Sequence, residues 1–297
     1  ASWNPLYIRI PACFVFYEDA TNALPFFVSI EGAGEKAYNE SIDKEPKGGL
    51  FMDEKLQKLK DWIAECDNIV FFGGAGVSTE SGIPDFRGEK GIFTAISEYG
   101  YRPEIILSHS FFEAHPDIFF QYYKKNLLYP DAKPNDCHKA LAKLEEMGKL
   151  KSVITQNIDD LHQKGGSKRV LELHGTLYRN YCLKCGKEFD LDYVTKDEGI
   201  TRCDKCGGIV RPDVVLYEEG LDEHTIEEAV HDISHAQMLI VGGTSLNVYP
   251  AAGLLHYFRG KYLVLINKSA TSMDKKADLV IAENIGEVFR KVVLEES

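Results

Sequence analysis

The sequence predicts an α/β protein in which helices cover both faces of a parallel sheet. Three observations support this class: short apolar runs recur along the chain, helical patterns lie between several of them, and two of the runs end in glycine-rich turns. Apolar runs that alternate with helices are typical of parallel strands buried on both faces. Ligands of such folds bind at the carboxyl ends of the strands, which is where the glycines and polar residues fall here.

The expected elements follow one another from about residue 52. Residues 53–65 place Leu56, Leu59 and Ile63 on one apolar face and predict a helix. Further helices are expected at residues 137–147 and 285–294. Six short apolar runs predict strands at residues 68–72, 152–155, 170–173, 238–241, 262–266 and 279–281. Two inserts interrupt the alternation: residues 91–134 are rich in Phe and Tyr at helical spacing, and residues 178–211 contain two cysteine pairs.

These patterns predict a Rossmann-like domain made from residues 52–90, 135–177 and 212–297. The two inserts, 91–134 and 178–211, are expected to form a small helical and zinc-binding domain. Residues 1–51 differ, because β-rich segments at 7–10, 14–17 and 26–30 precede a polar stretch that resembles a linker. We interpret them as an N-terminal extension of unknown role.

The composition excludes several classes of protein. The net charge is −12, from 34 basic and 46 acidic residues, which argues against direct nucleic-acid binding. No run reaches the roughly 18 apolar residues of a membrane span, and no basic leader indicates a secretory signal. Four of the seven cysteines form two CxxC pairs. This pattern favours a reduced, cytoplasmic location over a disulfide framework.

The two cysteine pairs predict a structural zinc site. A spacer of 17 residues separates them, as in zinc ribbons, and four thiolates close a tetrahedron without leaving a position for water. The predicted ligands are Cys182, Cys185, Cys203 and Cys206. The alternatives are two redox pairs or free thiols. The other cysteines, Cys13, Cys66 and Cys137, have no such pattern.

A glycine-rich turn follows the first predicted strand. Gly74, Ala75 and Gly76 let the backbone approach a pyrophosphate at the start of a helix, although a plain tight turn is the alternative. The dehydrogenase fingerprint GxGxxG is not completed, because Thr79 occupies its third position. This disfavours hydride transfer.

Several motifs resemble those of bacterial-type members of the sirtuin family and occur in the same order along the chain. They are GGAGVSTESGIPDFRG at residues 73–88, TQNIDDLH at 155–162, LHG at 173–175, the two cysteine pairs, GTSL at 243–246 and VLIN at 264–267. The resemblance covers about residues 52–295 and leaves the N-terminal extension unmatched. It implies an NAD-dependent protein-lysine deacetylase that acts on acylated proteins or peptides.

The resemblance also implies a mechanism. The acyl-lysine oxygen attacks the nicotinamide ribose, nicotinamide leaves, and His174 deprotonates a ribose hydroxyl, after which water releases lysine and acyl-ADP-ribose. Asn157 and Asp159 complete the implied catalytic set. A neutral imidazole is a suitable base near neutral pH.

The implied NAD-binding residues come from four of these motifs and from Lys268, which follows the last motif. Asp85 and Asp159 would orient the nicotinamide carboxamide, Phe86 would shield the reactive face, and the ribose hydroxyls would bind Gln156 and Asn157. The full set is Gly74, Ala75, Gly76, Asp85, Phe86, Arg87, Gln156, Asn157, Asp159, Gly243, Thr244, Ser245, Asn267 and Lys268.

The peptide-binding strand of the family corresponds to Val214, Val215, Leu216 and Tyr217. Much of the family reads FGE where this chain has Tyr217-Glu218-Glu219. These two glutamates would favour basic flanking residues in the substrate, or they form a solvated acidic turn.

Uncharged acyl groups are the expected substrates. Family members that prefer acidic acyl groups have a Tyr-x-x-Arg pair in a helix of the first insert, where this chain has Phe120 and Tyr123. Binding an acidic acyl group would bury its carboxylate without a cation to pair with, which would cost several kcal/mol of binding free energy.

Three other functions remain open. Mono-ADP-ribosyl transfer or NAD hydrolysis would use the same cleavage of the cofactor with a different acceptor. A non-catalytic NAD- or peptide-binding module is disfavoured, because it would not need Asn157, Asp159 and His174 together.

Overall fold

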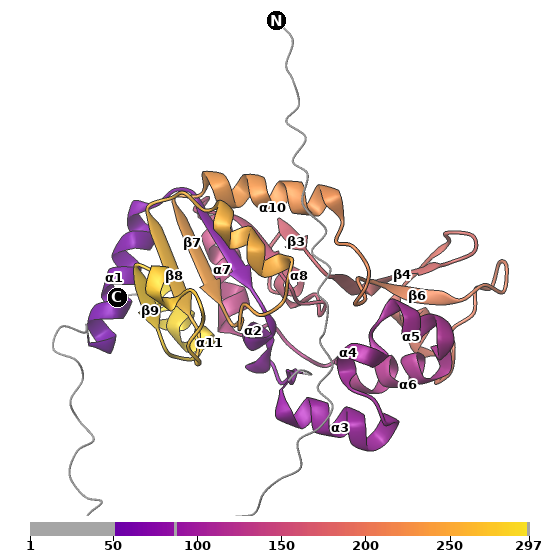
Figure 1. Ribbon diagram of the computed structural model, residues 1–297. Coiled ribbons are helices and arrows are strands. Elements are labelled where there is room, and N and C mark those ends of the chain that lie inside the picture. Colours follow the sequence, from indigo (N-terminus) through magenta and orange to yellow (C-terminus); the bar gives the residue numbers. More distant parts are fainter. Residues whose placement is uncertain (1–50, 86–87, 296–297) are drawn as a thin grey trace, which may run out of the picture. The chain divides into compact units, whose positions relative to one another are not determined.

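A computed structural model describes residues 51–85 and 88–295 (Figure 1). The β-rich segments expected within residues 1–50, and the roles expected of Phe86 and Arg87, lie outside the described residues.

The main sheet has six parallel strands in the order β3-β2-β1-β7-β8-β9 (Figure 1). All six strands were predicted from apolar runs, and the predicted fold class is confirmed. Gly73 at the end of β1 pairs with both Thr155 and Gly242, so three strand ends lie together. The strands are β1 Ile69–Gly73, β2 Leu150–Thr155, β3 Val170–Glu172, β7 Met238–Gly242, β8 Tyr262–Ile266 and β9 Leu279–Ile281.

Helices cover both faces of this sheet. One face packs against α1 Met52–Glu65, α7 Asp136–Glu146, α11 Ile285–Phe289 and the π-helical turn η3 Arg290–Leu294. The other face packs against α10 Glu223–His235 and the 3-10 helix η1 Ala251–Tyr257. The helices predicted at 53–65, 137–147 and 285–294 are confirmed, although the last ends in η3.

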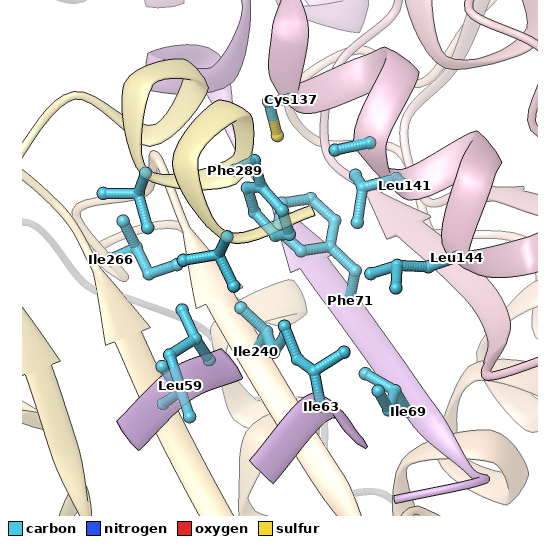
Figure 2. Close-up of a cluster of buried hydrophobic side chains, with 14 of the residues drawn as sticks. Leu59, Ile63, Ile69, Phe71, Cys137, Leu141, Leu144, Ile240, Ile266 and Phe289 are labelled. Carbon is cyan, nitrogen blue, oxygen red and sulfur yellow. The ribbon is translucent and has the colours of Figure 1, made fainter. Parts of the chain in front are cut away.

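The first of these two cores is centred on Phe71, whose ring makes an edge contact with Phe289 at 5.9 Å between ring centroids (Figure 2). Leu59 and Ile63 of α1 and Leu141 of α7 close over the same strands (Figure 2). Alternate residues of β1 point to opposite faces, so Val70 and Phe72 belong to the second core.

The two inserts share a third core. Helices α3 Glu89–Tyr99, α4 Pro103–Ile106, α5 His109–Ala114 and α6 Pro116–Asn126 come from the first insert. The second contributes α9 Leu191–Thr195 and an antiparallel sheet of order β5-β4-β6, with β4 Gly175–Cys182, β5 Glu188–Phe189 and β6 Val210–Val214. Phe119 and Phe120 of α6 pack with Leu177 of β4 and Val210 of β6. The predicted domain boundaries stay a prediction.

Three short elements complete the described chain: α2 Ala75–Thr79, α8 Leu161–Lys164 and η2 Asp274–Lys276. No helix within the described part of the chain combines the length and the apolar character that a bilayer-spanning segment needs.

Candidate active site

Two glycine turns meet at the carboxyl ends of β1 and β7. The N–H of Gly76 donates to the carbonyl of Gly243 at 2.7 Å. A Cβ on Gly76 would lie 2.7 Å from the Cα of Gly243, and one on Gly74 would lie 2.8 Å from the Cβ of Thr244. The structure therefore gives these glycines a second physical reason besides the approach of a pyrophosphate, namely the contact between the two turns.

A polar cluster follows β2 and contacts α2. Asn157 donates its amide to Ser78 Oγ at 3.0 Å and to the Gly74 carbonyl at 3.1 Å. Ser78 donates to the Asp159 carboxylate at 2.6 Å. Burial raises the pKa of Asp159, and the hydrogen bonds from Ser78 and the Leu161 N–H oppose that rise. The buried Gln156 side chain donates to Thr244 Oγ1 at 3.1 Å.

His174 lies between β3 and β4, and its ring contacts the end of β2. Its Nδ1 is 2.9 Å from the carbonyl oxygen of Gln156. A carbonyl only accepts hydrogen bonds, so Nδ1 carries the proton of the neutral ring and Nε2 is left as its basic nitrogen. The His174 carbonyl accepts from the N–H of Val215 at 3.0 Å.

These groups open on one cleft of about 230 Å³. Eight predicted site residues line it: Ala75, Gln156, Asn157, Asp159, His174, Val215, Leu216 and Tyr217. The imidazole of His174 is thus on the same side of the sheet as the Gly74–Gly76 turn. Lining residues that sequence reasoning missed include Ser78, Asn126, Leu127, Tyr129, Leu177 and Tyr249.

Other predicted residues lie beside the cleft without lining it. Val214 pairs with Gly175 in the antiparallel sheet. Asp85 is exposed, and its carbonyl accepts from the Gly88 N–H at 3.0 Å. The remaining ones follow β7 and β8 at the same edge of the sheet: Gly243, Thr244, Ser245, Asn267 and Lys268.

Phe120 and Tyr123 of α6 do not line this cleft. Both are fully buried, because α6 turns its aromatic face into the core of the inserts. The first insert reaches the cleft through Leu107 and through Asn126, Leu127 and Tyr129. Among the described residues that line the cleft, none is Lys or Arg.

The two glutamates differ in their surroundings: Glu218 is exposed, whereas Glu219 is partly buried. Glu218 adopts φ 77°, a left-handed conformation that favours glycine, and its carboxylate accepts from the N–H and Oγ of Ser110. Glu219 pairs with the buried Arg211 at 2.7 Å. Burial alone would raise the pKa of Glu219, but hydrogen bonds from Arg211, the Leu216 N–H and a neighbouring imidazole lower it to about 2.

The four predicted zinc ligands converge at one end of the small sheet. Their sulfurs lie within 4.8 Å of one another, with 3.4 Å between Cys182 and Cys206 and 3.7 Å between Cys185 and Cys203. Zinc–sulfur bonds of about 2.3 Å place tetrahedral thiolates roughly 3.8 Å apart, so the cluster fits a structural zinc ion. Cys66 and Cys137 are buried away from it.

A parallel sheet with helices on both faces, a cleft holding an imidazole at its strand ends and a four-cysteine module define an α/β enzyme of the dinucleotide-binding class. Residues 74–250 match the model of the Sir2 family. The chain belongs to the Sir2 family.

Its relatives include two proteins named NAD-dependent protein deacetylase. That of Clostridium acetobutylicum is 59% identical over 245 residues, which cover 82% of this chain and 100% of the relative. That of Clostridium perfringens is 60% identical over 243 residues, covering 82% and 100%.

Solved structures agree with this family. A Sir2 enzyme structure matches with a TM-score of 0.73 and 40% identity, covering 82% of this chain and 98% of the other. A complex of Sir2 with a p53 peptide and NAD+ matches with a TM-score of 0.70 and 37% identity, covering 80% and 96%. A Sir2 protein bound to a propionylated peptide matches with a TM-score of 0.70 and 36% identity, covering 80% and 97%.

Proposed function

We propose that this chain is an NAD-dependent protein-lysine deacetylase, which releases nicotinamide and transfers the acyl group to ADP-ribose. The observation that carries this proposal is that His174 opens on the same cleft as Asn157, Asp159 and the start of α2. Family membership and the names of the relatives support it.

The proposed roles follow from the donors and acceptors of the cleft. NAD supplies the sugar carbon at which the glycosidic bond is broken. His174 accepts a proton at Nε2, because its Nδ1 is held by the Gln156 carbonyl. Asn157 and Asp159 are held by Ser78 and orient the nicotinamide end of the cofactor. A fixed, half-buried polar cluster of this kind suits a substrate that carries hydroxyl and amide groups.

The rest of the cofactor is assigned to the strand ends beside the cleft. The Gly74–Gly76 turn faces the pyrophosphate, and the adenosine half lies over the residues that follow β7 and β8. Asp85, Phe86 and Arg87 keep their predicted roles as proposals. Zinc is proposed to hold the small module together and to take no part in the chemistry, because four thiolates complete its coordination.

The peptide is proposed to bind as an added strand along Val215–Tyr217, which lines the cleft next to His174. Neutral acyl chains suit the apolar residues of this cleft, which include Leu127, Ile158 and Leu177. We expect deacetylation to be faster than desuccinylation on peptides of matched sequence. A desuccinylation rate above the deacetylation rate would contradict this specificity.

The test is incubation with NAD and an acetyl-lysine peptide. Nicotinamide release should depend on the peptide, and mass spectrometry should find acyl-ADP-ribose. Nicotinamide release without the peptide would indicate NAD hydrolysis, and an ADP-ribosylated peptide would indicate transfer. His174→Tyr should abolish deacylation, and full activity of that variant would overturn the catalytic assignment.

A cytoplasmic location stays a prediction that rests on the four reduced cysteines.

A further inference from the structure

An ion pair between a buried arginine and a partly buried glutamate contacts the proposed peptide-binding strand. Arg211 of β6 and Glu219 approach to 2.7 and 3.1 Å through two nitrogen–oxygen contacts. The Arg211 side chain is only 5% exposed, and its guanidinium lies 5.3 Å from the ring centroid of Phe112. Two contacts between planar groups fix both distance and orientation, which a single contact does not.

The same two side chains bind the backbone of the strand. Arg211 donates to the carbonyl of Val214 at 2.6 Å, and Glu219 accepts from the N–H of Leu216 at 2.8 Å. These bonds lie on either side of Val215, whose own N–H donates to the His174 carbonyl at 3.0 Å. Three consecutive residues are thereby tied to the ion pair and to the proposed catalytic residue.

We infer that Arg211 and Glu219 are positioning residues that hold the Val214–Leu216 backbone in the conformation to which an acyl-lysine peptide adds. The inference rests on the proposed function. Neither side chain is assigned a chemical step. Their contribution is to pre-order a strand edge before the substrate arrives, which lowers the entropy that binding must overcome.

The substitutions must distinguish this positioning role from the loss of stability that follows when one charge of the ion pair is left buried without its partner. Arg211→Lys keeps the charge but loses the planar fork. The double variant Arg211→Met/Glu219→Leu removes both charges together. The matched control is Arg179→Lys, because Arg179 pairs with Asp213 on the same strand but is 60% exposed and binds none of the residues 214–216.

Steady-state kinetics should show an effect on the KM for the peptide but not on the KM for NAD. For Arg211→Lys we expect the peptide KM to rise about tenfold, the factor typical of one lost charge-assisted hydrogen bond. The KM for NAD and kcat should stay within about twofold to threefold, because His174 keeps its bond to Gln156. The double variant should raise the peptide KM further. Arg179→Lys should leave all three values unchanged.

Amide hydrogen exchange tests the same inference without substrate. In Arg211→Lys and in the double variant, the Val215 and Leu216 amides should exchange at least about tenfold faster, while those of β1 and β7 should not change. Unchanged exchange at Val215 and Leu216 would overturn the inference, as would an equal rise of both KM values. Absence of peptide-dependent nicotinamide release by the unmodified protein would instead refute the proposed function, and the positioning of a substrate would fall with it.

Discussion

Ser78 has no recognisable role in the sequence, yet it connects the site. Its hydroxyl donates to Asp159 and accepts from Asn157, so one small side chain on α2 fixes two residues that follow β2. Ser78 is buried, and it lies 79 and 81 positions before its partners. Nothing local in the sequence indicates such a contact, which forms only when the strand ends come together.

Ser78→Ala should therefore lower kcat/KM for NAD by about tenfold to a hundredfold, because two proposed cofactor-orienting groups lose their shared partner. Ser234→Ala, at a partly exposed serine of α10 far from the cleft lining, is the control and should have no effect. Steady-state kinetics at saturating peptide measure the change, and an unaltered kcat/KM would remove Ser78 from the site.

Two buried histidines make stability depend on pH. The rings of His138 and His162 lie 4.6 Å apart between centroids. Within the described part of the chain, His138 Nε2 and both ring nitrogens of His162 have no hydrogen-bond partner. Burial lowers the pKa of His138 to about 4 and the pKa of His162 well below its ordinary value. Both rings are therefore neutral in the folded protein near pH 7.

The free energy of unfolding should fall as the pH drops from 7 to 5. The unfolded chain binds protons near the ordinary histidine pKa, whereas the folded chain resists them, so acid favours unfolding. His138 alone should contribute a loss of about 2 kcal/mol at pH 5. Urea unfolding at both pH values measures this. His162→Phe should reduce the difference, and an equally steep dependence in that variant would exclude His162 as a cause.

At the scale of elements, a lysine of α6 binds the backbone of the zinc module, in addition to the apolar core that the two inserts share. Lys124 Nζ donates to the carbonyls of Asp197 and Gly199 at 2.6 and 2.7 Å, and to Thr201 Oγ1 at 3.1 Å. The stretch 197–201 precedes the second cysteine pair. The order of this stretch therefore depends on both α6 and the metal ligands.

Chelation of the metal should release a single zinc ion per chain and disorder the module. We expect deacylation to be lost with it, because β4 and β6 lead from the cysteines to His174 and Val215. The amount of zinc released should rise together with the number of reactive thiols, because the four ligand cysteines become accessible to a thiol reagent when the metal leaves. Cys66 and Cys137 are internal controls, since burial raises the pKa of both thiols. Full activity of the metal-free protein would contradict this.

The elements also show how far the sequence predicts the structure. The six parallel strands are predominantly apolar runs, so their pattern can be recognised without tertiary information. The strands β4 and β6 were missed, because a register shift between Thr176 and Asn180 breaks the alternation of buried and exposed residues. Within the site, the motif residues Gly74, Asn157 and His174 lie just after the strands β1, β2 and β3. Tyr129 and Tyr249 carry no motif and reach the cleft only through the packing of distant segments.

At the scale of the whole molecule, the match to the relatives covers only part of the chain. The clostridial relative is matched over its full length by 82% of this chain. The main sheet, the inserts and the cleft all belong to the unit Leu50–Ser297. This unit contains every residue to which a catalytic, cofactor, metal or peptide role is assigned.

A chain without residues 1–50 should therefore fold and retain its activity. We expect its melting temperature to lie within a few degrees of that of the full chain, and its kcat/KM within about twofold. Differential scanning calorimetry and the nicotinamide-release assay measure both. A large loss of either would assign a role to the N-terminal extension.

The contact between Gly76 and Gly243 also limits how this site can diverge. A Cβ at either glycine would collide with the backbone of the opposite turn. Gly243 also has a φ of 61°, a left-handed conformation that residues with a side chain rarely adopt. Two sequence segments more than 160 residues apart along the printed chain must therefore change together or not at all. Natural variation that enlarges one of them should be accompanied by a rebuilt partner loop, and directed libraries should randomise both segments at once.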